Sequence, residues 1–165
     1  MRRGYKHKDL VEASALGDLE RLKKYAKLGL FDTIYDVKMA VYYCTRSCSI
    51  SCVDYLISNS DISLEELFAN RNLVWEMYGR KDISSYVRME MLTYLYDKGL
   101  TDILSQLATY CFLNKDNELF DSMLIKFNTL ENYELILHIS REYKNTMFQT
   151  LIQQKIRETK IDSIL

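Results

Sequence analysis

Proline is missing from this sequence of 165 residues, and glycine occurs only five times. Average usage would give about eight prolines and a dozen glycines in a chain of this length. Tight turns and chain breakers are therefore scarce, which disfavours a fold made of many strands and β-turns. The sequence instead favours helices joined by short polar connections, and we predict an all-α fold.

Excess charge and long apolar runs are scarce as well. The formal net charge is −1 and the isoelectric point is near 6.1, without the basic excess that usually accompanies nucleic-acid binding. No stretch approaches the roughly 18 uninterrupted apolar residues of a membrane span, and the start lacks the apolar segment of a signal peptide. We expect a cytoplasmic protein that binds neither membrane nor nucleic acid.

The residues that are present form a repeating pattern of two short helices. In the first copy, small and aliphatic residues lead to Gly17-Asp18, after which apolar residues return at helical spacing until Gly29. Polar turns then recur at an even interval of 30 to 35 positions, marked by Gly17, Cys48, Arg80, Lys115 and Asn145. The five predicted units cover residues 8–30, 36–60, 70–99, 101–128 and 131–157. The pattern predicts a helical solenoid of about five helix-turn-helix units in one domain.

The first unit resembles an ankyrin repeat. Ala13 takes the place of that family's first-helix alanine, and Gly17 that of its turn glycine. The second-helix aliphatic positions correspond to Leu19, Leu22 and Ala26. Residues 86–99 resemble the family's second helix and closing glycine. No copy has the family's Thr-Pro-Leu-His opening, so we expect the β-hairpin loops between units to be short or absent.

This resemblance implies a non-enzymatic module that binds a protein partner through the concave face of the solenoid. It places the partner near residues 32–35, 70–72 and 101–102. The candidate partner-binding residues are Tyr35, Tyr42, Arg71, Trp75, Asp102 and Tyr110. Exposed tyrosines favour interfaces, although the alternative that most of the thirteen tyrosines are core or rim residues stays open.

The composition also resembles a group of viral proteins. A divergent ankyrin-like chain that is poor in proline and rich in Tyr, Ile, Asn and Lys is similar to the multigene-family and ankyrin-like proteins of large cytoplasmic DNA viruses. That resemblance implies a modulator of host immune signalling in the host cytoplasm. Polar residues at both ends of the array, Arg21, Lys23 and Lys24 in the first unit and residues 153–160 in the last, are typical of capping repeats and favour a monomer.

Three of the four cysteines, Cys44, Cys48 and Cys52, lie four residues apart. With Cys111 or a histidine they could supply zinc ligands, but zinc sites usually contain a second paired motif. The alternative is that cysteine serves as a small apolar residue, because Cys44 and Cys111 lie at corresponding places in two units. We favour this packing role and predict no metal or other cofactor.

Candidate catalytic and nucleic-acid-binding residues are few. His7 and His138 are the only histidines, and His138 lies in a helix where we expect a structural role rather than that of a base. Glu65 and Glu66 are expected to begin a helix, where carboxylates interact favourably with the helix dipole. We predict no enzyme. The alternative function is nucleic-acid binding through the basic N-terminus, with Arg2, Arg3, Lys6 and Lys8.

Overall fold

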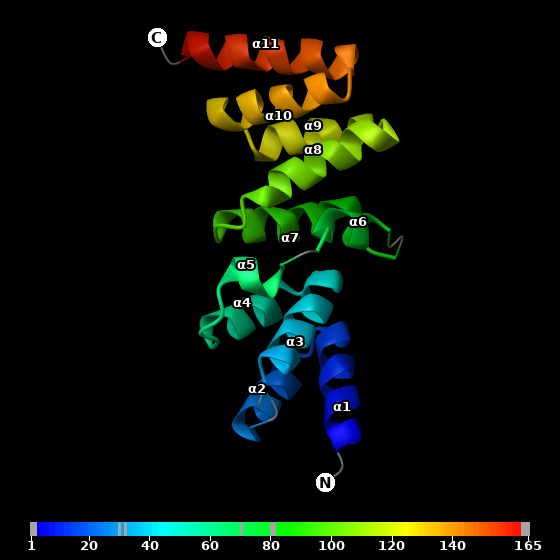
Figure 1. Cartoon of the computed structure of the whole chain (residues 1–165), viewed down its shortest axis with the longest axis vertical. Coiled ribbons are helices and arrows are strands. Elements are labelled where there is room, and N and C mark those ends of the chain that lie inside the picture. Colours follow the sequence, from blue (N-terminus) through cyan, green and yellow to red (C-terminus); the bar gives the residue numbers. More distant parts are fainter. Residues whose placement is uncertain (1–2, 30, 32, 70, 80–81, 163–165) are drawn as a thin grey trace. The chain divides into compact units, whose positions relative to one another are not determined.

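The computed structural model describes residues 3–29, 31, 33–69, 71–79 and 82–162. These residues form eleven helices and no strand, so the predicted all-α fold is confirmed for the described part of the chain (Figure 1). The helices are α1 Arg3–Leu16, α2 Leu19–Lys27, α3 Ile34–Arg46, α4 Ile50–Ser58, α5 Leu64–Leu67, α6 Leu73–Tyr78, α7 Ser85–Asp97, α8 Asp102–Asn114, α9 Asn117–Lys126, α10 Leu130–Glu142 and α11 Thr146–Asp162. They group into two compact units, which are larger than the five predicted repeats. From here on, the first unit is Met1–Arg71 with Glu76–Tyr94, and the second unit is Asn72–Trp75 with Leu95–Leu165.

One turn geometry joins four helix pairs: α1–α2, α3–α4, α8–α9 and α10–α11. Each turn has one residue in the left-handed region, with φ between 51° and 66°: Gly17, Cys48, Lys115 and Lys144. The N–H of the next residue bonds to the carbonyl five positions back, at distances of 2.9 to 3.2 Å. Those carbonyls belong to Ala13, Cys44, Cys111 and Ser140, all with 0% exposure. This bond is the one that closes a helix in a Schellman motif.

After three of the four left-handed positions, the next residue caps the helix that follows; Ser49, which follows Cys48, forms no side-chain cap. The side chains of Asp18, Asp116 and Asn145 each accept a hydrogen bond from the N–H three residues on, at 3.0 to 3.2 Å. Such caps stabilise a helix by about 1 kcal/mol. The first helix therefore ends and the second begins within two or three residues, as the polar turns in the sequence predict.

The turn between α6 and α7 is stabilised differently. The Arg88 side chain is buried, and its guanidinium lies 4.5 Å from the centre of the Tyr78 ring. Its Nη1 donates to the carbonyls of Met77 and Tyr78 at 3.3 and 3.4 Å. Arg88 thus satisfies carbonyl groups at the end of α6. The marker position Arg80, predicted for this turn, lies outside the described residues.

The first unit packs α1 against α2 and α3, and α4 against α2 and α3. Its core includes fully buried Leu22, Val41 and Leu92. Two consecutive turns also touch: the Ser47 hydroxyl donates to the Ser14 carbonyl at 3.2 Å, and a Cβ at Gly17 would lie 2.8 Å from Ser49 Oγ. Glycine is therefore required at position 17 for both its backbone conformation and its close approach to Ser49.

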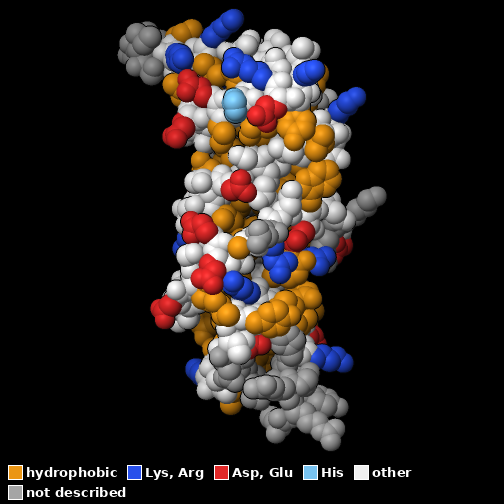
Figure 2. All heavy atoms as spheres, viewed as in Figure 1, with side chains coloured by type: hydrophobic (Ala, Val, Ile, Leu, Met, Phe, Trp, Pro, Cys, Tyr) orange, Lys and Arg blue, Asp and Glu red, His pale blue; other side chains and the backbone are white. Residues whose placement is uncertain are grey.

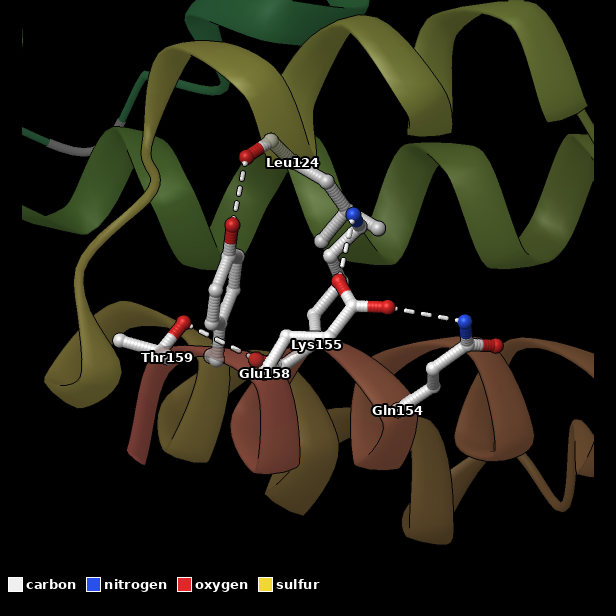
Figure 3. A network of polar contacts seen from close by, with 6 residues as sticks. Leu124, Gln154, Lys155, Glu158 and Thr159 are labelled. Carbon is white, nitrogen blue, oxygen red and sulfur yellow. Dashed lines mark hydrogen bonds and ion pairs between the residues drawn. The ribbon is translucent and has the colours of Figure 1, made fainter. Parts of the chain in front are cut away.

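The second unit packs α8 against α9 and α10, and α10 against α11. Three aromatic rings pack together in its core: the ring centres of Phe112 and Phe120 lie 5.3 Å and 4.0 Å from that of Phe148. The buried Tyr133 hydroxyl donates to the Leu124 carbonyl at 3.1 Å, satisfying both groups (Figure 3). The surface of α11 beside it is polar: Glu158 accepts hydrogen bonds from Gln154 and Lys155 at 2.9 Å (Figure 3).

The helix ends differ from the predictions in a few places. Gly29 and Gly99 have positive φ and follow α2 and α7, as predicted for glycines that close a helix. α3 begins at Ile34, two residues before the predicted second repeat of residues 36–60, because Thr33 forms a capping box with Asp36.

Candidate partner-binding surfaces

Two residues predicted to bind a partner meet in the second unit. The rings of Trp75 on α6 and Tyr110 on α8 make an edge-to-face contact, with their centres 4.8 Å apart and their planes at 69°. Trp75 is 41% exposed and Tyr110 is half-buried. An aromatic pair of this kind contributes about 0.5–1.5 kcal/mol beyond the burial of its area. The contact therefore orients a large, partly exposed indole at the surface.

A polar row continues from this pair along α8. Asp102, Gln106 and Tyr110 are spaced four residues apart, which places them on one face of the helix. Gln106 Nε2 donates to Asp102 Oδ2 at 2.8 Å, and Gln106 Oε1 accepts from the Val74 backbone N–H at 3.5 Å. Gln106 was not predicted, although its position midway between two predicted residues is a signal that could have identified it.

The backbone of Trp75 is also fixed locally. Asn72 Oδ1 accepts a hydrogen bond from the Trp75 N–H at 3.2 Å and so caps α6. The segment 70–72 was predicted to lie near the partner, and Asn72 is exposed. Asn70 lies outside the described residues. We call the group Asn72, Trp75, Asp102, Gln106 and Tyr110 the aromatic patch.

Two other predicted residues meet in the first unit. The Arg71 guanidinium lies 3.9 Å from the centre of the Tyr42 ring on α3, and Arg46 lies 5.5 Å from the same centre. Arg46 Nη1 also donates to the Tyr42 hydroxyl at 3.2 Å, while Arg71 pairs with Glu76 at 3.8 Å. Two guanidinium groups thus lie near the Tyr42 ring. Arg46 was missed, although it follows Tyr42 by four residues on the same helix.

Tyr35, the remaining predicted residue, lies in the first turn of α3 and is 58% exposed. It precedes Tyr42 by seven residues, two helical turns, so both belong to one face of α3. Asp32, predicted as its neighbour at the surface, lies outside the described residues.

The charged side chains near these groups are of both signs. On the face drawn in Figure 2, Lys and Arg side chains are interspersed with Asp and Glu side chains. Lys38 pairs with Glu66 at 3.4 Å. Of the basic N-terminal residues, Lys8 is exposed on α1. Arg2 and the side chains of Arg3, Lys6 and His7 lie outside the described residues.

The four cysteines are free thiols, and three of them are buried. A hydrogen bond with Cys52 and burial raise the pKa of the Cys44 thiol far above its usual range. Burial and the charge of Asp116 raise the pKa of Cys111 as well. Cys48 is half-buried in the turn. Among the described residues, no group of three or more His, Cys, Asp or Glu side chains is placed to hold a metal ion.

The remaining candidates for chemistry lie at the surface. His138 on α10 is exposed, with Nε2 3.7 Å from Glu142 Oε1 one turn away. Its side chain faces solvent and takes no part in the core; the expectation of a structural role rather than that of a base stays a prediction. Glu65 and Glu66 lie in the first turn of α5, as predicted, and Ser63 Oγ accepts from the Glu66 N–H at 3.1 Å.

None of the helices in the described part of the chain combines the length and apolar character needed to cross a membrane. Comparisons of the chain with models of protein families, with curated proteins and with solved structures find no match.

Proposed function

We propose that this protein is a non-enzymatic, ankyrin-like helical-repeat solenoid that binds a protein partner. The turn geometry shared by four helix pairs supports repetition of one structural unit. The observation that carries the binding function is the contact between Trp75 and Tyr110 at the surface of the second unit. Partly exposed Trp and Tyr bury a large area with little loss of side-chain entropy, and they dominate the energy of many interfaces.

The aromatic patch has the composition of an interaction site. Its centre is the aromatic pair, and Asn72, Asp102 and Gln106 border it with polar groups that hydrogen-bond within the patch. An apolar centre with a polar border is the usual anatomy of a protein interface. In the first unit, Tyr42 together with Arg46 and Arg71 offers a second aromatic and cationic anchor, with Tyr35 on the same helix. The viral resemblance extends the proposal to a cytoplasmic partner in host immune signalling.

The proposal is tested by affinity purification from host cells with quantitative mass spectrometry. We expect a partner whose recovery falls about tenfold in Trp75→Ala and in Tyr110→Ala, because loss of one central aromatic residue typically costs more than 1 kcal/mol of binding energy. Tyr42→Ala tests the contribution of the first unit. Tyr86→Ala is the matched control, because Tyr86 is an exposed tyrosine on α7.

Thermal unfolding of each purified variant separates lost binding from lost folding. If truncation to alanine destabilises the protein, Trp75→Phe and Tyr110→Phe keep a ring in place while changing its contact surface. The proposal is wrong if every protein recovered with the wild type is recovered equally with the folded Trp75, Tyr110 and Tyr42 variants.

A further inference from the structure

A cavity of about 460 Å³ opens in the second unit between two consecutive turns. One side of it belongs to the α8–α9 turn and the other to the α10–α11 turn, so its lining contains the left-handed residues Lys115 and Lys144. This volume lies within the range of about 300–1,000 Å³ typical of ligand pockets. We call it the inter-turn cavity.

The deep wall of this cavity is aromatic. Phe112 and Phe148 are buried core residues that also line it, with their ring centres 5.3 Å apart. Tyr143 and Met147 line it from the surface, where they are 41% and 50% exposed. An apolar side chain of a ligand would therefore exchange water for contact with rings and a thioether.

The charged side chains that line the cavity are both lysines. Lys115 and Lys144 are exposed, and within the described residues neither forms an ion pair. Asp116, which follows Lys115, accepts a hydrogen bond from the Leu119 N–H at the start of α9, and Glu142, two residues before Lys144, lies 3.7 Å from His138. Two ammonium groups bordering an aromatic hollow complement a ligand with carboxylates beside an apolar side chain.

We propose that the inter-turn cavity binds an acidic peptide segment, with an apolar or aromatic side chain inserted against Phe112 and Tyr143 and flanking carboxylates paired with Lys115 and Lys144. The site is separate from the aromatic patch: Phe112 and Tyr110 are two residues apart on α8, which places them about 200° apart around the helix. The proposal does not depend on the patch, so the two can succeed or fail independently.

The test uses the full chain and four fluorescein-labelled peptides, with binding followed by fluorescence anisotropy. The peptides are Glu-Glu-Phe-Glu-Glu, Glu-Glu-Gly-Glu-Glu, Gln-Gln-Phe-Gln-Gln and Lys-Lys-Phe-Lys-Lys. We expect the acidic aromatic peptide to bind best, because it alone matches both the rings and the lysines. Its affinity is expected to fall as salt rises, since exposed ion pairs are screened.

The variants Lys115→Glu and Lys144→Glu are each expected to weaken binding of the acidic aromatic peptide about fivefold, because an attraction becomes a repulsion. Arg157→Glu is the matched control: it makes the same change in net charge on α11, at a residue outside the cavity lining, and should leave binding nearly unchanged. The double variant with both substitutions is expected to prefer the basic peptide over the acidic one.

Amide shifts in ¹⁵N-labelled protein locate the bound peptide. Shifts confined to residues that line the cavity support the proposal. The same shifts should be seen in Trp75→Ala, because a loss of cellular partner binding in that variant would concern the aromatic patch alone. Three results would overturn it: no binding of the acidic aromatic peptide at about 1 mM, equal binding of acidic and basic peptides, or equal losses in Arg157→Glu and the lysine variants. If a glutamate variant is unfolded, Lys115→Ala with Lys144→Ala repeats the comparison.

Discussion

At the scale of single residues, the left-handed turn positions carry the most specific requirements. Gly17 has φ of +66°, a conformation that costs other L-residues about 1 kcal/mol or more. It also lies so close to Ser49 that an added Cβ would be 2.8 Å from Oγ and 2.9 Å from Cβ of that serine. Backbone conformation and packing therefore both select glycine here.

We expect Gly17→Ala to lower the free energy of unfolding by about 2 kcal/mol, of which about half comes from the contact with Ser49. Urea denaturation followed by circular dichroism measures the change. In a Ser49→Gly background the same substitution should cost only about 1 kcal/mol, because the contact is gone and the backbone strain stays. Equal costs in the two backgrounds would show that the close approach has no energetic effect.

The four cysteines differ in how accessible their thiols are to solvent. Cys44, Cys52 and Cys111 are buried, and the raised pKa values of Cys44 and Cys111 keep those thiols protonated at neutral pH. Because the thiolate is the reactive form, both burial and protonation slow the modification of Cys44 and Cys111. The hydrogen bond with Cys44 instead lowers the pKa of the Cys52 thiol, so burial alone protects Cys52. Cys48 lies half-buried in its turn.

Native alkylation with iodoacetamide is expected to modify Cys48 first, with at least about tenfold slower labelling of the other three. Peptide mass spectrometry at timed intervals gives the four rates, and Cys48→Ser should abolish the fast phase. Labelling in urea should make all four comparable. Fast native labelling of Cys44 or Cys52 would contradict the packing role assigned to them.

At the scale of elements, local signals explain much of what the sequence predicts. Apolar spacing locates the helices, and a left-handed residue followed by Asp or Asn both ends one helix and caps the next. The sequence alone did not reveal that Cys48, Lys115 and Lys144 adopt the conformation of Gly17. Their side chains disfavour positive φ, and the turn is closed by the N–H of the following residue, which donates to a carbonyl five positions before it.

Replacing the left-handed Lys115 by glycine tests whether its backbone conformation destabilises the turn. Lys115→Gly is expected to raise the free energy of unfolding by about 0.5 kcal/mol, since relief of the left-handed strain exceeds the added entropy of the unfolded chain. Lys115→Ala is the control, because it removes the charge and keeps a Cβ, and it should leave stability nearly unchanged. Differential scanning calorimetry compares the three proteins. A larger gain in the alanine variant would mean that charge repulsion, rather than backbone strain, destabilises the turn.

At the scale of the whole molecule, charge limits the classes of partner. The net charge is −1, and on the face drawn in Figure 2 both signs are mixed over the surface. A protein that neutralises many phosphates releases counterions and binds more weakly as salt increases. The alternative function, nucleic-acid binding through the basic N-terminus, requires this behaviour.

Filter binding with short RNA and duplex DNA at about 50 mM and 200 mM salt tests that alternative. We expect little retention at either concentration, because the molecule as a whole offers phosphates no attraction. Tight binding at low salt that falls steeply at high salt, and that is lost when Arg2, Arg3, Lys6 and Lys8 are changed to Gln, would favour nucleic acid over a protein partner.

Residues close together in the chain were enough to predict the all-α class and the helix-turn-helix pairs, because helical periodicity and caps depend on residues within about five positions of one another. The sequence also selected Trp75, Tyr110, Tyr42 and Arg71 as surface candidates. The contact of Trp75 with Tyr110 and the position of Arg71 over Tyr42 could not be predicted before the chain was seen folded. The tertiary structure likewise brought Lys115 and Lys144 to one cavity. These pairs are distant in the chain, and their approach depends on how packed helices place one turn beside the next.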